Sequence, residues 1–246
     1  MKIVGIIPAR YGSTRLEGKP LKDICGKPMI QRVYEAAQGA RLLDQIYVAT
    51  DDQRIVHAVE TFGGNVRMTS PDHKTGTDRI AEVAANLDVD IVVNLQGDEP
   101  LLNPAMIDEV IQPFVADLAL PMSTLCVPIL EEKALHDPNV VKVVFDQRGN
   151  ALYFSRSLIP YPRKRDNFIA YEHLGLYAYR KDFLMTYISL PQSRLEINES
   201  LEQLRVLEAG YRLQVVVSAH PYDGVSVDTQ EDLERVQQII QARMNK

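Results

Sequence analysis

The chain has 246 residues, of which 46% are hydrophobic and 24% are charged, and these values exclude a disordered or collagen-like protein. It carries 33 Asp and Glu against 27 Lys and Arg, and this acidic balance argues against a nucleic-acid-binding protein, which needs a broad basic surface. No apolar stretch approaches the roughly 20 residues that cross a bilayer. We therefore expect a cytoplasmic protein with no membrane or nucleic-acid partner, whose ligand is a small anion.

The first half of the chain alternates short apolar runs with helical patterns. The spacing predicts strands at 2–8, 45–50, 65–68 and 90–95, and helices at about 28–40, 52–62, 78–87 and 103–115. This order predicts an α/β fold with a mostly parallel sheet and helices on both faces. Ligands of such folds bind outside the carboxyl ends of the strands. Three segments that follow predicted strands are therefore candidate site elements, at 8–19, 50–52 and 96–100.

The second half of the chain has a different pattern. Between about 120 and 195, strands rich in Val and Tyr at 140–145, 152–155 and 173–179 predict an antiparallel insertion. The sequence leaves open whether this lobe covers an active site or forms a dimer contact. A helix at about 196–208, a strand at 212–217 and a final helix at 229–243 complete the chain, which we expect to form a single domain, 1–246.

A basic loop follows the first predicted strand. Residues 10–22 carry four cations and one acid, whereas the chain as a whole is acidic. The loop also contains two glycines and two hydroxyl residues, so it collects backbone N–H groups and positive charge in one place, as a polyphosphate site requires. Its glycines are spaced one residue too far apart for a Walker loop. A solvated basic turn is the alternative interpretation.

Two aspartates are candidate metal ligands. Asp98 follows the apolar strand 91–95, where a carboxylate could hold Mg²⁺ against phosphate oxygens. Capping of the next helix is the alternative role, but that helix is predicted to begin near Asn103. Asp228 could complete the metal site. It could equally be an N-cap, with Glu231 three residues later forming a capping box.

Three further segments carry polar groups that could contact a nucleotide or a sugar. The turn 72–79 ends in Arg79, which could reach a carboxylate or phosphate, and Thr75 or Thr77 could cap the helix that follows. In the predicted strand 171–179, His173, Gly175, Tyr177 and Tyr179 share one face, which suggests a sugar-binding wall. In the predicted helix 196–208, a polar stripe lies beside a buried stripe. The polar stripe is Glu199, Glu202, Gln203 and Val206, and the buried one is Ile197, Leu201, Leu204 and Leu207. Packing and a solvated helix face are the default interpretations of these last two patterns.

Together these segments resemble the 3-deoxy-manno-octulosonate (Kdo) cytidylyltransferase family over nearly the whole chain. The matching motifs are IIPARYGSTRLEGKPL, YVATDDQRI, HKTGTDR, VVNLQGDEP, DPNVVKVVFD, ALYFSRSLIPY, HLGLYAYR, SLEQLRVLEAG and SVDTQEDLERV. The first and fourth motifs are shared with a wider nucleotidyltransferase group, whereas HLGLYAYR and SLEQLR belong to the Kdo branch. Glu17 departs from the family, which usually has Pro at this position.

The resemblance implies a nucleotide-diphospho-sugar transferase fold, a homodimer and the transfer of CMP from CTP to Kdo for lipopolysaccharide synthesis. It implies Mg²⁺ at Asp98 and Asp228, and phosphate contacts from Arg10 and Lys19; these four would be the catalytic residues. The implied nucleotide-binding set is Pro8, Ala9, Arg10, Ser13, Lys19, Thr75, Gly76, Arg79 and Gln96. The implied sugar-binding set is Arg156, His173, Tyr177, Glu202 and Gln203.

Other functions remain open on the sequence. A cytidylyltransferase for another sugar acid, 8-amino-Kdo or a sialic acid, is the nearest alternative, and HLGLYAYR with SLEQLR argues against the sialic-acid type. A non-catalytic CTP-binding regulator would bind the nucleotide without releasing pyrophosphate.

Overall fold

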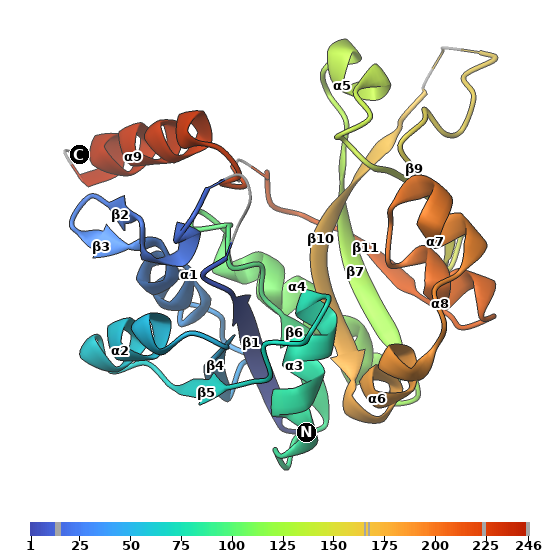
Figure 1. Ribbon diagram of the computed structural model, residues 1–246. Coiled ribbons are helices and arrows are strands. Elements are labelled where there is room, and N and C mark those ends of the chain that lie inside the picture. The colour runs from blue at the N-terminus through green and yellow to red at the C-terminus, as the bar shows by residue number, and fades with distance from the viewer. Residues whose placement is uncertain (13–15, 165, 167, 223–224, 245–246) are drawn as a thin grey trace. The chain divides into compact units, whose positions relative to one another are not determined.

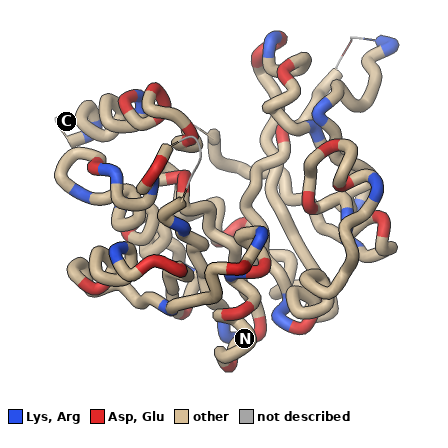
Figure 2. The backbone as a smooth tube through the Cα atoms, in the orientation of Figure 1, with Lys and Arg blue, Asp and Glu red and all other residues tan. Residues whose placement is uncertain are grey.

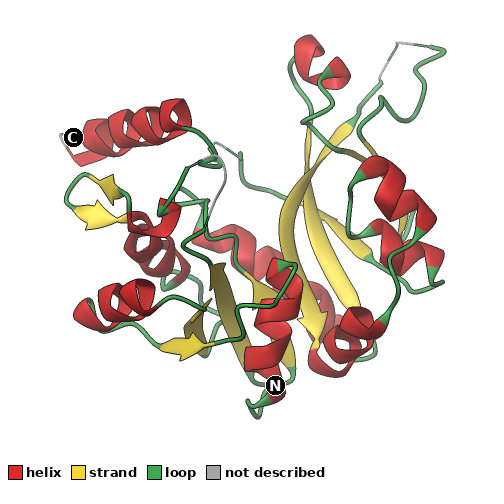
Figure 3. Cartoon of the chain, in the orientation of Figure 1, coloured by secondary structure: helices red, strands yellow, loops and turns green. Residues whose placement is uncertain are grey.

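The computed structural model describes residues 1–12, 16–164, 166, 168–222 and 225–244 (Figure 1). The chain divides into two compact units. The first consists of Met1–Asp108 and Tyr222–Lys246, and the second of Glu109–Pro221. Both units combine helices and strands (Figure 3), and Lys and Arg are interspersed with Asp and Glu along the backbone (Figure 2).

The first unit contains a parallel sheet of four strands in the order β6-β1-β4-β5. The strands are β1 (Ile3–Ala9), β4 (Gln45–Thr50), β5 (Val66–Met68) and β6 (Ile91–Asn94). In β1, Ile6 and Ile7 point to opposite faces of the sheet and both are fully buried. Both faces at this strand are therefore covered, as the near-continuous apolar sequence of β1 predicts.

Helices of the first unit connect these strands and pack against the sheet. α1 (Met29–Ala37), α2 (Gln53–Thr61) and α3 (Gly76–Ala85) contact the sheet, and α4 (Pro104–Ala116) begins in this unit. The short 3-10 helix η1 (Lys19–Leu21) and the hairpin of β2 (Asp23–Ile24) and β3 (Lys27–Pro28) lie outside the predicted elements.

The C-terminal helix α9 (Gln230–Met244) packs onto the segment that follows β1 (Figure 1). An apolar cluster joins them, consisting of Leu16, Ile24, Met29, Val227, Leu233, Val236 and Ile240. This cluster brings residue 228 close to residue 19, although the two are far apart in the sequence.

The second unit is built mainly on antiparallel pairs. β7 (Met122–Pro128) pairs with β10 (Tyr171–Arg180), and β8 (Lys142–Phe145) pairs with β10 and with β9 (Ala151–Ser155). β11 (Gln214–Val217) runs parallel to β7. The helices are α5 (Glu132–His136), α6 (Lys181–Ser189), α7 (Arg194–Glu199) and α8 (Leu204–Glu208). The predicted α/β fold with an antiparallel insertion is confirmed.

The prediction of one continuous helix at 196–208 is wrong. The chain forms α7 and α8 instead, because Ser200 adopts a left-handed conformation with φ 53° that ends α7. Ile197, expected in the buried stripe, is 60% exposed, whereas Leu201 and Leu204 are buried as predicted. A buried ion pair between Glu196 and Arg205, with Oε2 and Nε 2.8 Å apart, holds the two short helices together.

No helix in the described part of the chain is long and apolar enough to span a membrane.

Candidate active site

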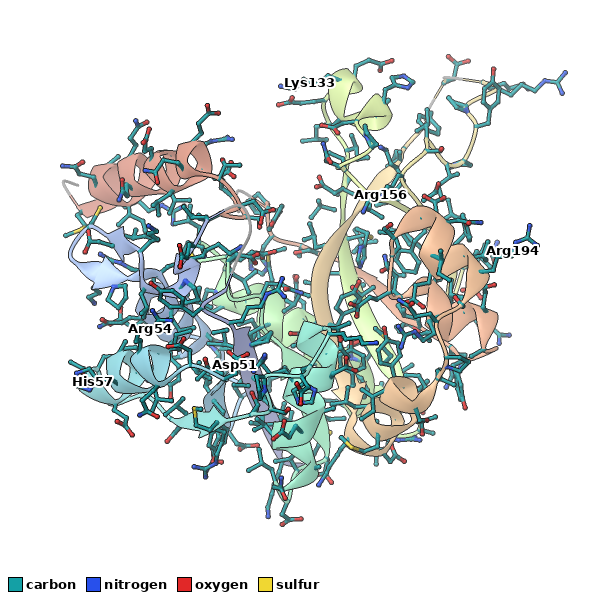
Figure 4. All side chains as sticks on the ribbon, in the orientation of Figure 1. Asp51, Arg54, His57, Lys133, Arg156 and Arg194 are labelled. Atoms are coloured by element: carbon teal, nitrogen blue, oxygen red, sulfur yellow. The ribbon has the colours of Figure 1, made fainter. Side chains whose placement is uncertain are left out.

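Tyr11, in the loop that follows β1, contacts Gly18 and Arg54. The Gly18 N–H donates to the Tyr11 carbonyl at 3.0 Å, and Gly18 has φ +64°, which favours glycine. The guanidinium of Arg54, which is labelled in Figure 4, lies 3.3 Å above the centre of the Tyr11 ring, a cation–π contact, and also pairs with Asp52. Arg10 is exposed directly after β1, and Ser13 lies outside the described residues. Arg54 therefore adds a cation to this loop that the sequence analysis did not identify.

Three of the predicted nucleotide-binding segments meet at Pro8. A Cβ built on Gly97, in the loop after β6, would lie 2.8 Å from the Pro8 carbonyl oxygen, and one on Gly76 would lie 3.3 Å from the Pro8 ring. Glycine at position 97 thus allows the backbone that follows β6 to approach the backbone of β1 at Pro8. Thr75 caps α3 in a capping box with Asp78, which settles the choice between Thr75 and Thr77. Ala9 is buried at the end of β1, and Gln96 follows β6.

Arg79 contacts a protein carboxylate. Its guanidinium is buried and donates to Asp51 at 2.8 Å and to the Thr69 hydroxyl. Asp51 follows β4, so it belongs to the second candidate segment of the sequence analysis (Figure 4). The pair links α3 to the carboxyl end of β4. The role of Arg79 in nucleotide binding stays a prediction.

Lys19 joins the two predicted metal ligands. Its Nζ lies 2.9 Å from Asp98 Oδ2 and 3.3 Å from Asp228 Oδ1. The three side chains are only partly exposed, at 17%, 27% and 40%. In addition, the Val227 N–H donates to the Asp98 carbonyl at 2.9 Å, so the two backbones are tied together. We call Asp98 and Asp228 the acidic pair.

The acidic pair fits Mg²⁺ by its donor set. Mg²⁺ is usually bound by one or two carboxylates together with water and substrate phosphates. In the described part of the chain, no three His, Cys, Asp or Glu side chains are grouped as a metal site. The ammonium between the two carboxylates shows that this position favours a cation.

Asp228 is not the helix cap that its sequence position suggested. Thr229 Oγ1 accepts from the Asp232 N–H at 3.2 Å, and the Asp232 carboxylate accepts from the Thr229 N–H at 2.9 Å. These two residues form the capping box of α9, with Asp232 in the place proposed for Glu231. Asp98 does not cap α4 either, because that helix begins at Pro104. Both carboxylates are thus used at the Lys19 site.

Glu99, next to Asp98, is a titratable group that the sequence analysis did not single out. Burial and the neighbouring Asp98 carboxylate raise the pKa of Glu99 to about 8, and Tyr222 hydrogen-bonds to it. At neutral pH Glu99 is therefore mainly protonated, which limits the negative charge beside the acidic pair.

The predicted sugar-binding residues all lie in the second unit. Aromatic rings form a row from His173 through Tyr177 and Tyr179 to Tyr187, with centroids 5.4, 6.1 and 6.1 Å apart. The Tyr187 hydroxyl donates to the Glu202 carbonyl at 3.2 Å. The row therefore connects the polar face of β10 to the segment between α7 and α8, which contains Glu202 and Gln203.

Gln203 and Arg156 differ in how many hydrogen bonds their side-chain polar groups make. Gln203 is 3% exposed, and its Nε2 has no hydrogen-bond partner among the described residues. A buried donor without a partner is costly, so a ligand acceptor would satisfy it. Arg156 (Figure 4) donates from its guanidinium to the carbonyls of Pro138, Glu199 and Ser200, which uses part of its donor set.

His173 is expected to make the fold sensitive to acid. Burial lowers the pKa of His173 from an ordinary 6.5 to about 3. Between these values the unfolded chain binds a proton that the folded chain does not, so the free energy of unfolding falls as the pH falls through this window. We expect His173→Gln to reduce this loss by up to about 1.4 kcal/mol per pH unit. Urea denaturation at several pH values across the window measures the free energy of unfolding of the wild type and of the variant. The same dependence on pH in both proteins would contradict the prediction.

Comparisons with known proteins give the family. A family model described as cytidylyltransferase matches residues 4–218. The 3-deoxy-manno-octulosonate cytidylyltransferase of Geobacter metallireducens is 53% identical over 250 residues, covering 96% of this chain and 96% of that protein. The same enzyme of Geotalea uraniireducens is 54% identical over 250 residues, covering 96% and 98%.

A solved structure gives the same result. The structure of a CMP:2-keto-3-deoxy-manno-octonic acid synthetase complexed with CTP has a TM-score of 0.94 and 47% sequence identity to this chain. The similarity covers 99% of this chain and 100% of that one. The resemblance drawn from the motifs is confirmed, and the chain belongs to the cytidylyltransferase family, as one of its 3-deoxy-manno-octulosonate cytidylyltransferases.

Proposed function

We propose that this protein transfers the CMP group of CTP to Kdo and releases pyrophosphate. The observation that carries the proposal is the contact of Lys19 with the acidic pair, beside a basic loop that follows β1. One cation and two carboxylates from distant parts of the chain are suited to bind a nucleoside triphosphate with its metal. Near-full-length similarity to named Kdo cytidylyltransferases supports the choice of both substrates.

At the α-phosphorus the reaction forms one bond and breaks one. The anomeric hydroxyl oxygen of Kdo attacks the α-phosphorus of CTP, the bond from that phosphorus to the bridging oxygen breaks and pyrophosphate leaves, and the hydroxyl proton passes to solvent water. Such a transfer requires mainly positioning and charge neutralisation from the protein. Arg10 and Lys19 supply the positive charge, and Arg79 orders α3 through Asp51.

Asp98 and Asp228 would hold Mg²⁺. The ion would neutralise phosphate charge and acidify the attacking hydroxyl. The protonated Glu99 carboxyl keeps a further negative charge away from this position.

The second unit supplies the groups for the sugar acid. We assign Kdo binding to Arg156, His173, Tyr177, Glu202 and Gln203, because this set combines donors, acceptors and aromatic faces, as a polyhydroxylated acid requires. The buried Gln203 Nε2 supports the assignment. We treat residues 1–246 as one catalytic domain, because the similarity to named Kdo cytidylyltransferases extends over nearly the whole chain.

We further propose that the protein acts in the cytoplasm, as a homodimer, in lipopolysaccharide synthesis. The family resemblance supports all three statements. Exposed apolar side chains support self-association: Leu130 is 92% and Tyr161 85% exposed, and Leu130 lines a pocket with Ile129, Leu158 and Phe168 together with the acidic Glu131 and Glu132. Apolar side chains gathered in this way are typical of protein interfaces.

Pyrophosphate release from CTP and Mg²⁺, measured with Kdo, 8-amino-Kdo and a sialic acid, tests the function. We expect release with Kdo. Binding of CTP without pyrophosphate release with any acid would identify a nucleotide-binding regulator. Release only with 8-amino-Kdo or only with the sialic acid would identify a cytidylyltransferase for that acid.

The sugar assignment predicts a selective kinetic effect. We expect His173→Ala and Gln203→Ala to raise the Michaelis constant for Kdo about tenfold or more while changing that for CTP little, because each removes a hydrogen-bonding group that contacts only the sugar. Initial rates with each substrate varied in turn measure the two constants. Equal effects on both would indicate a purely structural role.

A further inference from the structure

Thr124 in β7 faces the ring of His173 in β10. Its Oγ1 lies 3.0 Å from His173 Nε2, and Thr124 is fully buried. The pairing of β7 with β10 changes register between Leu174 and Tyr177. This irregularity turns two backbone carbonyls toward the same hydroxyl: Thr124 Oγ1 lies 3.1 Å from the Leu174 oxygen and 2.9 Å from the Leu176 oxygen.

These contacts determine the direction of the hydrogen bond to His173. A hydroxyl has one proton to donate, and a carbonyl oxygen can only accept. If the Thr124 proton pointed at His173, its oxygen would face two carbonyl oxygens with no proton between them, which is strongly repulsive. The Thr124 proton therefore lies toward the carbonyls, and Thr124 accepts a hydrogen bond from His173 Nε2–H.

The ring of His173 then has a single tautomer. Burial lowers the pKa of His173 to about 3, so the ring is neutral at neutral pH. A neutral imidazole with its proton on Nε2 has a lone pair on Nδ1. Phe154 packs edge-on against the ring at 4.9 Å and Tyr177 lies at 5.4 Å, so the ring orientation is fixed as well. His173 as a whole is half-buried.

We propose that Thr124 is a positioning residue, which holds His173 in the Nε2–H tautomer so that Nδ1 accepts a hydrogen bond from a hydroxyl of the sugar acid. The inference rests on the proposed function, in which His173 binds Kdo. It also specifies the group that is recognised, because a lone pair attracts a hydroxyl proton and repels a carboxylate. Thr124 thereby selects a polyhydroxylated part of the substrate, and the carboxylate has to be bound elsewhere.

Side-chain ¹⁵N NMR of the ligand-free protein tests the tautomer directly. The chain has 5 histidines, and the His173→Gln variant assigns the His173 signals. We expect a protonated Nε2 and an unprotonated Nδ1 at neutral pH. We expect Thr124→Val to lose this single tautomer and to raise the Michaelis constant for Kdo roughly tenfold, the effect of one lost hydrogen bond. The constant for CTP should stay within about twofold, and Thr124→Ser, which retains the hydroxyl, should restore both readouts.

Ser123→Ala is the matched control. Ser123 is the preceding residue of β7 and is also fully buried, but its hydroxyl donates to the Val110 carbonyl. We expect this variant to lose stability comparable to Thr124→Val without any change in the tautomer or in the Michaelis constant for Kdo.

Three results would overturn the inference. One is an Nδ1–H or doubly protonated His173 in the wild type, even if His173→Ala still impairs Kdo use and the proposed function stands. Another is an unchanged Michaelis constant for Kdo in a folded Thr124→Val variant. The third is an unchanged constant in His173→Ala, which would remove the sugar-binding role of His173 and with it the hydroxyl contact, whatever the tautomer.

Discussion

Asp228→Asn is expected to lower the rate of CMP transfer by about 100-fold or more while leaving the melting temperature nearly unchanged. The swap keeps the size of the side chain but removes the charge that faces Lys19, where we propose Mg²⁺ to bind. Stability is preserved because Thr229 and Asp232, not Asp228, form the capping box of α9. Steady-state rates over a Mg²⁺ titration, together with thermal melting, measure both effects.

Asp232→Ala is the matched control for this prediction. It removes an acid at the start of the same helix, and we expect a stability loss of about 1 kcal/mol from the broken cap, with only a small change in rate. The two variants should thus show opposite patterns. Wild-type rate and Mg²⁺ dependence in Asp228→Asn would refute the metal role.

The acidic pair should also behave as a unit. Asp98→Asn is expected to lose as much activity as Asp228→Asn. The double variant should lose much less than the product of the single effects, because either substitution alone already disrupts the same site. Multiplicative losses would mean that the two carboxylates act separately.

The sequence predicted the periodic elements of the first unit well because their signals are local. The apolar runs of β1, β4 and β6 are visible in neighbouring residues alone, whereas the sequence left Thr75 and Thr77 open as the cap of α3. The helix at 196–208 was mispredicted because its apolar spacing continues through Ser200, whose left-handed backbone no periodicity indicates.

The contacts of the site were less predictable because they depend on tertiary structure. The motifs indicated Asp98, Asp228 and Lys19 as candidates, but their meeting point depends on the apolar cluster that docks α9 onto the segment after β1. Thr124 carries no sequence signal at all. Its importance follows from the register shift between β7 and β10, which brings two carbonyls and a histidine to one hydroxyl.

Removing the Lys19 ammonium is expected to impair CTP use and to increase the response of the fold to Mg²⁺. In the folded protein Lys19 neutralises the acidic pair, so Lys19→Met leaves two carboxylates facing one another. Without Mg²⁺ we expect a loss of about 1 kcal/mol, a modest value because the three side chains are partly exposed. Since Mg²⁺ no longer competes with an ammonium, the ion should raise the melting temperature of Lys19→Met more than that of the wild type.

The same variant should lose about 100-fold in kcat/KM for CTP, because a charge-assisted contact to phosphate is lost along with the positioning of the acidic pair. Lys22→Met is the matched control, since Lys22 lies in the same loop but takes no part in the contacts between Lys19 and the acidic pair. For this variant we expect a small kinetic effect and a wild-type response of the melting temperature to Mg²⁺. Mg²⁺ titrations monitored by thermal melting, in the absence of nucleotide, separate the two readouts. If Mg²⁺ stabilised Lys19→Met no more than Lys22→Met, the acidic pair would not be the ion's site, and a kinetic loss in Lys19→Met would then reflect phosphate binding alone.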